Sequence, residues 1–593
     1  MRIRVMLKYG CAVLAVAALV LPLAAAGAAG GKLDGLTRVS RDGIVDGLAL
    51  HRSEVQPSLA ADGAKTLVGA FEVGRIFNGG SSAIGFATSA DGGNRWHEGL
   101  LPLTVGSGQK TTAAGVVWRA GDPSVAYDAS HHAWLVASTG LNGTGGAVGL
   151  FVNGSKDGNK WSGPVVAHAA GTGDAPDNGS LACDDWPSSK SYGTCYLAYD
   201  NTASSPGNQL QLVTSTDGGK VWSAPVSTPD ASTGTGVVAL VQPPPKGAAP
   251  GTACGRLVVS YAGSTASNGG VFSVTSDDCG ATLSAHTQIL PNMTATHTVA
   301  QTVRTGLVVS GSMDGAGAIY LAWQTRSFRT MQTTLAAAAS AGDTNVKVTS
   351  VTGMVAGNAL TIDSSGANPE TVTITTVGTA GAGGTGVMFT PALAFAHASG
   401  AFVTVNGVAS TSTAAPNDIA LSVMPAPTDA TPTPTFGAPA RIPIEADTGA
   451  SSNTVDHFIP AIAADPASSG ASARLALFYY SYPLAACIYV DNPSNTCSPR
   501  VDYVSSTDEG ANWSDVQELS PGPPSLGVFP RTLALGGSGN GGPDLGSVLA
   551  TAVVPVGKLQ GNAIGLFPVG IPVNGLDESM YAPKKGLEIG GAR

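Results

Sequence analysis

The chain of 593 residues has a formal net charge of -10, and only 12% of its residues are charged. This acidic balance argues against a nucleic acid or an anionic membrane surface as a partner. Glycine (79) and proline (38) are abundant, and Ala, Leu, Glu and Lys do not recur at helical spacing. The composition therefore excludes a protein of long helices and favours short strands between turns, in several domains or one large repeat structure.

The beginning of the chain has the pattern of a secretion signal. Three basic residues lie within the first eight positions, an apolar run extends from 11 to 23, and small residues follow from 24 to 31. A transmembrane anchor is the alternative, but the run is short and no basic stop-transfer cluster follows it. We expect residues 1–29 to be a cleaved signal peptide, and the mature protein to be secreted or periplasmic without a membrane span.

A turn motif with the frame S-x-D-x-G-x-x-W recurs along the mature chain. Full copies occupy 89–96, 215–222 and 506–513, the copy at 276–283 has Leu in place of Trp, and the copy at 155–161 is one residue short. In such a turn Asp can accept hydrogen bonds from backbone N–H groups ahead of it, Gly can take a positive φ, and Trp can pack the turn onto a sheet. The aspartates to which we assign this structural role are Asp91, Asp157, Asp217, Asp278 and Asp508.

The spacing of these copies predicts a propeller. The first four aspartates are 66, 60 and 61 residues apart, which fits a repeating unit of about four strands. Each unit also has a shared opening, as at 57–60, 123–126 and 460–463. Counting the openings gives six units, and a seventh without the motif can be read from 529 to 569, so six and seven blades both stay open.

This repeat resembles the Asp-box, or bacterial neuraminidase repeat, and the resemblance covers nearly the whole chain. It implies an all-β fold, a six- or seven-bladed sialidase-like β-propeller, in which the boxes lie on the edge opposite the ligand face. Sialidases use an arginine triad, a Tyr nucleophile paired with a Glu, and an Asp acid/base. The first Arg normally opens the first blade in an R-I-P motif, but this chain has Gln56-Pro57-Ser58 there.

The period is broken between 323 and 418. Residues 330–406 have short strand-like segments of their own and no copy of the turn motif. We expect them to form a small β domain inserted at a hairpin tip, and a disordered Ala/Gly-rich loop is the alternative. The remaining expected divisions are the two parts of the propeller, 30–329 and 407–575, and a C-terminal tail, 576–593.

Candidate functional residues lie in the loops that open each unit, which in a propeller converge at one end of the channel. Arginine forks pair with carboxylates, Trp stacks on pyranose rings, and Asp can bind hydroxyls or act as an acid. The alternative for each residue is a turn cap or a local pair. We predict catalytic roles for Asp122, Asp185 and Tyr480. The residues predicted to bind substrate are Arg119, Asp184, Trp186, His457 and Arg531.

Six cysteines follow the expected signal peptide, and an even number in an exported protein favours disulfides. They form three local pairs, so we predict the disulfides Cys183–Cys195, Cys254–Cys279 and Cys487–Cys497. No C-x-x-C occurs and the histidines lack zinc-ligand spacing, so neither a metal nor a cofactor is expected.

Three functions are compatible with these patterns. The first is a secreted, sialidase-like glycoside hydrolase, with exo-α-sialidase-like activity on terminal acidic sugars of glycans. The second is a non-catalytic propeller that binds glycans or proteins at the cell surface, since a fold alone does not determine function. The third is a glycosidase or lyase for neutral or uronic sugars. In each case we expect a monomer with a glycan or glycoconjugate ligand.

Overall fold

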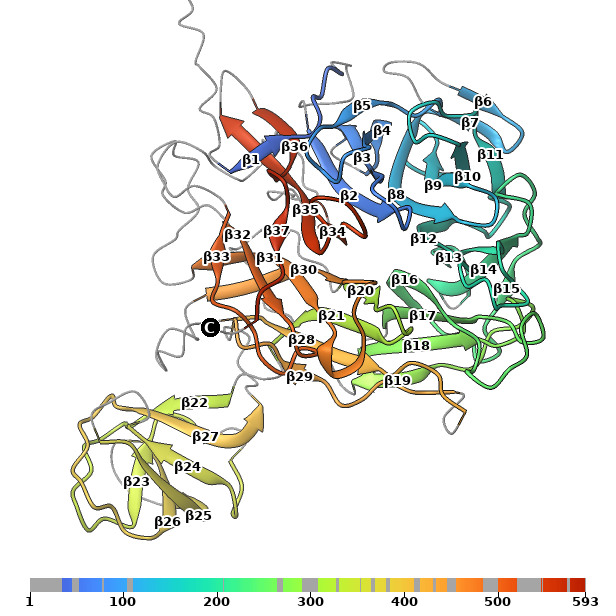
Figure 1. Ribbon diagram of the computed structural model, residues 1–593. Helices are drawn as coiled ribbons and strands as arrows, with labels where there is room; N and C mark the ends of the chain where they lie inside the picture. The colour runs from blue at the N-terminus through green and yellow to red at the C-terminus, as the bar shows by residue number, and fades with distance from the viewer. Residues whose placement is uncertain are drawn as a thin grey trace, which may run out of the picture. The chain divides into compact units, whose positions relative to one another are not determined.

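The computed structural model describes residues 35–44, 53–76, 79–103, 110–205, 207–263, 270–290, 308–326, 330–351, 354–363, 368–379, 384–409, 416–429, 433–444, 455–483, 500–519, 546, 548–572 and 576–591. These residues are almost entirely in antiparallel strands and turns, with one 3-10 turn at Gly470–Ser472 (Figure 1). Within these ranges no helix is long and apolar enough to cross a membrane. The expected signal peptide lies outside the described residues.

Seven groups of antiparallel strands follow one another in the described chain, and we number them as sheets I to VII; I and II are joined into one eight-stranded sheet by a single pairing, Ser81 with Ala120. Sheets I and II are β2 (Glu54–Ala61), β3 (Leu67–Arg75), β4 (Ser81–Ser89) and β5 (His97–Leu100), then β8 (Arg119–Asp128), β9 (Ala133–Leu141), β10 (Ala147–Ser155) and β11 (Val165–Ala169). Sheets III and IV are β12 (Pro176–Cys183), β13 (Cys195–Asn201), β14 (Gln209–Ser215) and β15 (Val226–Ser227), then β16 (Gly234–Gln242), β17 (Arg256–Gly263), β18 (Gly270–Ser276) and β19 (Thr287–Leu290).

The later sheets use strands that are farther apart in the sequence. Sheets V and VI are β20 (Val309–Met313), β21 (Ile319–Thr325), β28 (Asp418–Met424) and β29 (Ala440–Arg441), then β30 (Val455–Ala464), β31 (Leu475–Pro483), β32 (Arg500–Ser506) and β33 (Gln517–Glu518). Sheet VII combines β34 (Ala550–Val553), β35 (Asn562–Pro572), β36 (Leu576–Pro583) and β37 (Leu587–Glu588) with the N-terminal strand β1 (Leu36–Arg38). Between sheets I and II, β6 (Lys110–Thr112) and β7 (Gly115–Val117) form a short hairpin.

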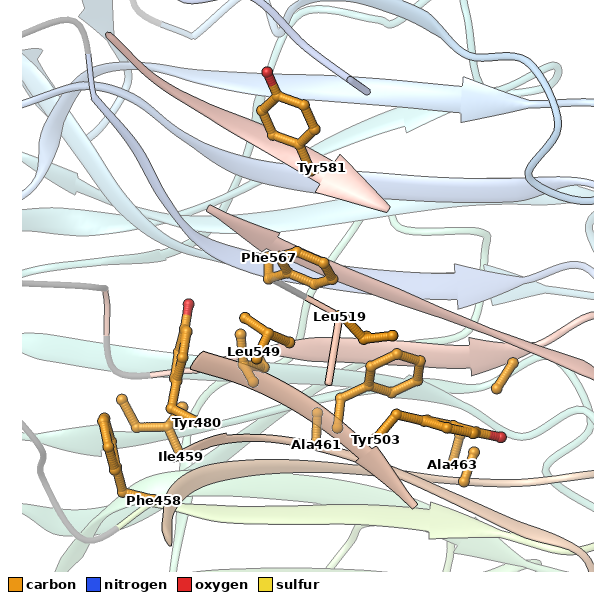
Figure 2. Packing of buried hydrophobic residues seen from close by; sticks show 14 of the residues in the cluster. Phe458, Ile459, Ala461, Ala463, Tyr480, Tyr503, Leu519, Leu549, Phe567 and Tyr581 are labelled. Atoms are coloured by element: carbon orange, nitrogen blue, oxygen red, sulfur yellow. The ribbon is translucent and has the colours of Figure 1, made fainter. Parts of the chain in front are cut away.

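The hydrophobic core is a series of layers between successive sheets. One cluster joins each consecutive pair from I and II to VI and VII, with two clusters between IV and V, and a further cluster joins VII to I. Figure 2 shows the layer between VI and VII, where Phe458 stacks on Tyr480, and Phe567 and Tyr581 belong to the same cluster. Because the middle strands are covered on both faces, they are mostly apolar, as in the buried strand β3, where Glu72 and Arg75 are the charged exceptions.

The first strands of the seven sheets contact one another in cyclic order: β2, β8, β12, β16, β20, β30, β34 and again β2. A serine hydroxyl in four of these strands accepts a hydrogen bond from a backbone N–H of the next first strand. The pairs are Ser58 with Val125 (3.0 Å), Ser124 with Leu181 (2.9 Å), Ser180 with Ala239 (3.0 Å) and Ser310 with Ile462 (3.0 Å). These bonds fix the offset between neighbouring sheets.

The motif copies form turns of one kind, which we call the repeat turns. In each, the Ser hydroxyl donates to the Asp carboxylate, a Gly N–H donates to the Ser Oγ, and the Asp Oδ1 accepts from a backbone N–H three or four residues ahead. The four Trp side chains donate Nε1–H to the carbonyl of the turn glycine, at 2.9–3.1 Å. The carboxylates are thus used inside the turns that carry them.

Residues 330–409 form a separate six-stranded sheet between β21 and β28, which pair directly with each other in sheet V. Its strands are β22 (Thr330–Thr334), β23 (Asn345–Val348), β24 (Ala359–Ile362), β25 (Glu370–Thr379), β26 (Thr385–Thr390) and β27 (Phe402–Ala409). Its hydrophobic cluster contains no residue from any of the seven sheets. The segment therefore has a core of its own.

Two of the three predicted disulfides are present, Cys183–Cys195 and Cys254–Cys279, with Cα–Cα distances of 4.0 and 5.3 Å. The third predicted pair, Cys487–Cys497, lies outside the described residues. Disulfides within single sheets are typical of proteins that fold in an oxidising compartment.

Candidate functional site

Five first strands share the same irregularity near their N-terminal ends. In each, two residues of the first strand are unpaired and the pairing with the second strand shifts by one residue, and the first unpaired residue has a positive φ between 48° and 65°. These residues are Gln56, Asp122, Asn178, Gly236 and Ile459. Three of them precede proline, which is tolerated in a bulge because no ladder hydrogen bond is required there.

The bulges surround a cavity of about 720 Å³, which is within the usual range for small-ligand sites. Its lining comes from the first strands of all seven sheets, together with hairpin tips of sheets I and II. The bulges of sheets I to IV line it directly, and sheet VI contributes Pro460. Because a bulge re-aims side chains out of the regular alternation, residues that would pack between sheets instead face the cavity.

The charged residues that line this cavity are three acids, Glu72, Asp122 and Asp177, and one base, Arg75. The carboxyl groups of Asp122 and Asp177 are hydrogen-bonded to each other, and the backbone N–H of Asp122 donates to Glu72 Oε1 at 3.3 Å. Asp177 belongs to β12 and Glu72 to β3, so neighbouring sheets bring the three acids together.

A network of hydrogen bonds around Asp200 lies next to Asp177. The Asn178 amide donates to Asp200 Oδ1 at 3.1 Å and to Thr235 Oγ1 at 3.0 Å, and Asn208 donates to Asp200 Oδ2 at 2.5 Å. Asp200 lies opposite Asp177 in the pairing of β13 with β12. The carboxyl cluster is therefore held in place by side chains from sheets III and IV.

Burial and repulsion from neighbouring acids favour the protonated forms of Asp122 and Asp200. Burial raises the pKa of Asp122 well above its ordinary value, and the charges of Asp177 and Glu72 raise it further. Burial, with a contribution from Asp177, raises the pKa of Asp200 to about 7 despite the hydrogen bonds from Asn208 and Asn178. An aspartic acid that keeps its proton near neutral pH can act as a general acid.

Of the predicted catalytic residues, Asp122 lines the cavity and Asp185 does not. Asp185 lies beyond the C-terminal end of β12 and accepts a hydrogen bond from Ala129 N–H at 2.7 Å, just beyond the end of β8. Six residues of strand separate Asp122 from that end of β8, or roughly 20 Å. Asp185 and Asp122 therefore lie at opposite ends of the first strands, and the structure corrects the expectation that they converge.

The neighbours of Asp185 have structural partners at the same end. Asp184 is buried and accepts hydrogen bonds from the hydroxyls of Ser189 and Ser191 at 2.6 and 2.7 Å, and the Trp186 indole donates to the Val241 carbonyl at 2.7 Å. Neither residue lines the cavity. The opening of the third unit is at Pro176–Ser180, seven residues before the position that the sequence pattern indicated.

Three further predicted residues are also placed away from the cavity lining. The Arg119 guanidinium donates to the carbonyls of Gly79 and Gly143, at 3.3 and 2.7 Å. His457 is buried against Tyr479 and lies 4.0 Å from an Asp418 carboxylate oxygen. Tyr480 is buried in the layer between sheets VI and VII, where burial and the nearby Glu578 raise its pKa well above the usual range (Figure 2).

Arg531, the last predicted binding residue, lies outside the described residues. The acids that the sequence analysis missed are Glu72, Asp177 and Asp200. Asp177 could have been found by aligning Ser180 with Ser58 and Ser124, which make the same hydrogen bond to the next sheet. Within the described ranges the one cluster with metal-ligand spacing is Asp128 with Cys183 and Cys195, whose sulfurs form a disulfide.

No protein-family model matches the chain, and no curated protein matches it. Several solved structures are similar at low identity. The intramolecular trans-sialidase from Ruminococcus gnavus is 12% identical with a TM-score of 0.36, covering 92% of this chain and 97% of that chain. A protein of unknown function from Dyadobacter fermentans is 14% identical with a TM-score of 0.38, covering 76% and 96%. An exo-β-1,3-galactanase from Phanerochaete chrysosporium is 11% identical with a TM-score of 0.28, covering 62% and 100%. At these values the likeness carries no argument about activity.

Proposed function

We propose that this chain is a secreted, seven-bladed β-propeller of the sialidase-like kind, and that it hydrolyses glycosidic bonds in the cavity at the first strands. The observation that carries the proposal is the hydrogen-bonded carboxyl pair of Asp122 and Asp177 in a cavity of ligand size. The cyclic contacts of the first strands support the propeller, and the repeat turns support its relation to the Asp-box repeat.

The carboxyl groups supply what glycoside hydrolysis requires. Such enzymes use one carboxylic acid to protonate the leaving oxygen and one carboxylate as base or nucleophile. Asp122 is the candidate acid, because burial and its acidic neighbours raise its pKa and keep it protonated near neutral pH. The two catalytic carboxyl groups of such enzymes lie about 5–10 Å apart, so Glu72 is the candidate for the carboxylate, and Asp177, which is hydrogen-bonded to Asp122, orients the acid.

The charges of the cavity favour a neutral sugar. Asp122 keeps its proton, so Glu72 and Asp177 are the acids of the lining that would repel a sugar carboxylate, and Arg75 is the one guanidinium of the lining that could balance them. Arg119 binds backbone carbonyls instead. Hydrolysis of a neutral terminal sugar is therefore the primary proposal, and exo-α-sialidase activity on acidic sugars is the alternative.

Binding without turnover is a second candidate. Two elements that a sialidase-like mechanism would use, Arg119 and Tyr480, are buried in structural contacts. In a binding protein, the carboxyl and amide groups at the bulges would hold glycan hydroxyls through hydrogen bonds without acid catalysis.

The test uses purified mature protein and 4-methylumbelliferyl glycosides of neutral hexoses and pentoses in both anomeric forms, with a sialoside in parallel. We expect release of the fluorophore from a neutral glycoside, and its loss in Asp122→Asn. Asp185→Asn, which changes an aspartate at the other end of the strands, is the matched control and should keep full activity. Turnover of the sialoside alone would favour the alternative, and glycan binding without turnover would favour the binding protein.

A further inference from the structure

An exposed tryptophan packs against a hairpin tip that lines the cavity, on a segment that the catalytic proposal does not use. Trp118 is 40% exposed, although large apolar side chains in the described chain are mostly buried. It follows β7 and precedes β8, and its backbone N–H donates to the Leu141 carbonyl at 2.8 Å. Leu141 begins the hairpin tip between β9 and β10, and Leu141, Gly145 and Gly146 of this tip line the cavity.

The indole ring packs against that same hairpin tip. Gly143 lies so close that a Cβ at its position would be 3.8 Å from Trp118 Cγ. The tip itself is ordered by Asn142, whose Oδ1 accepts hydrogen bonds from the backbone N–H groups of Thr144 and Gly146, both at 2.9 Å. Trp118 is thus supported from one side by a turn that forms part of the cavity wall.

The Arg119 side chain joins this hairpin tip to the neighbouring tip of sheet I. Its guanidinium joins the carbonyl of Gly143 to that of Gly79, and Gly79 also lines the cavity from the neighbouring tip of sheet I. A buried guanidinium that bridges two hairpin tips holds them at a fixed distance. The exposed indole therefore packs on a hairpin tip that is held in place, and this lowers the conformational entropy that is lost when a ligand binds to the indole.

We propose that Trp118 is a stacking platform for the second sugar of a neutral oligosaccharide whose terminal sugar occupies the cavity. This inference rests on the proposed function. The flat indole face suits the apolar C–H face of a pyranose ring, and this contact requires no charge on the sugar. The acidic cavity and the aromatic rim together select an uncharged chain of at least two sugars, so Trp118 determines specificity for chain length.

The experiment compares wild type, Trp118→Ala and Trp118→Phe on neutral gluco-, galacto-, xylo- and arabino-oligosaccharides of two to six sugars, and on the monosaccharide aryl glycoside that the wild type cleaves. Trp118→Ala should lower kcat/KM on the oligosaccharides by about five- to tenfold, as expected for loss of one aromatic contact. Trp118→Phe should retain part of the activity, and the aryl glycoside should show a loss in the same direction, because its aromatic aglycone occupies the place of the second sugar. Oligosaccharide binding should also shift tryptophan fluorescence in the wild type and less in Trp118→Ala.

Tyr192→Ala is the matched control, because Tyr192 is an aromatic residue of similar exposure (37%) in the loop between β12 and β13, at the end of the strands where Asp184 and Asp185 lie. It should behave as wild type on every substrate. Equal kcat/KM for wild type and Trp118→Ala on all oligosaccharides that the wild type cleaves would overturn the inference while leaving the hydrolase proposal intact. A wild type that cleaves and binds none of these sugars would instead overturn the proposed function itself.

Discussion

Glu54 connects the beginning and the end of the described chain, and its ionisation should control stability. The side chain is 1% exposed, and its Oε2 accepts hydrogen bonds from the Ser40 hydroxyl and from the Met580 N–H, the latter at 2.8 Å. Burial raises the pKa of Glu54 from its ordinary 4.5 to about 8, with smaller contributions from the charges of Asp42 and Glu98. The folded protein therefore holds this carboxyl in its neutral form at neutral pH.

The raised pKa defines both the direction and the size of the effect. Between pH 4.5 and about 8 the folded protein keeps a proton that the unfolded chain releases, so stability falls as the pH rises through this range. A difference of one in pKa corresponds to about 1.4 kcal/mol, so the full effect is at most about 5 kcal/mol. Glu54→Gln removes the ionisation and keeps an oxygen that can accept from Ser40 and Met580.

We expect the urea midpoint of Glu54→Gln to equal that of wild type near pH 4.5 and to exceed it clearly at pH 8.5. The measurement is urea unfolding followed by tryptophan fluorescence at the two pH values. A variant that is less stable than wild type at pH 8.5, or a difference that is the same at both pH values, would show that the folded protein ionises Glu54 at its ordinary pKa.

Three further predictions concern the stability of the fold. Asp217→Ala removes the acceptor of three hydrogen bonds in a half-exposed repeat turn, so we expect thermal unfolding to show a loss of about 1–2 kcal/mol of stability. Glycan affinity should be unchanged, and lost affinity in a folded variant would refute the placement of this turn away from the ligand. Replacing Cys183 and Cys195 by Ala opens a loop closed by residues 12 apart and should cost about 3 kcal/mol, whereas an unchanged urea midpoint would contradict this. Replacing 330–406 by a short turn should leave a soluble protein with a cooperative unfolding transition, because that segment has its own hydrophobic cluster. Loss of the transition would show that sheet V needs this segment to fold.

The architecture could be predicted because its signals are local and repeated. A turn such as 215–222 needs Ser, Asp, Gly and Trp at fixed spacing to satisfy its hydrogen bonds, so each copy can be read from eight residues. The period breaks between 323 and 418, and β21 and β28 pair with each other across that break. The disulfide Cys254–Cys279 joins cysteines 25 residues apart within sheet IV and could be inferred from local pairing.

The site was harder to predict because it depends on which ends of the strands meet. Asp122 was found from the Asp-Pro opening, but Glu72 lies in the middle of an apolar second strand and meets Asp122 only through packing of neighbouring sheets. The third unit has Gly179-Ser180 where the first two units have Pro-Ser, so its opening was placed at Asp185, at the opposite end of the strand. Strand periodicity shows which face of a sheet a side chain occupies, but it does not show which residues of neighbouring sheets lie at the same level along the strand axis.

The most direct test of the central proposal is the rate at which wild type and Asp122→Asn hydrolyse one neutral aryl glycoside near pH 6, with folding checked by circular dichroism. If Asp122 is the general acid of the cavity, kcat should fall by about 10²- to 10⁴-fold in the folded variant. A folded Asp122→Asn protein that hydrolyses the glycoside at the wild-type rate would contradict the assignment of catalysis to the carboxyl pair of Asp122 and Asp177.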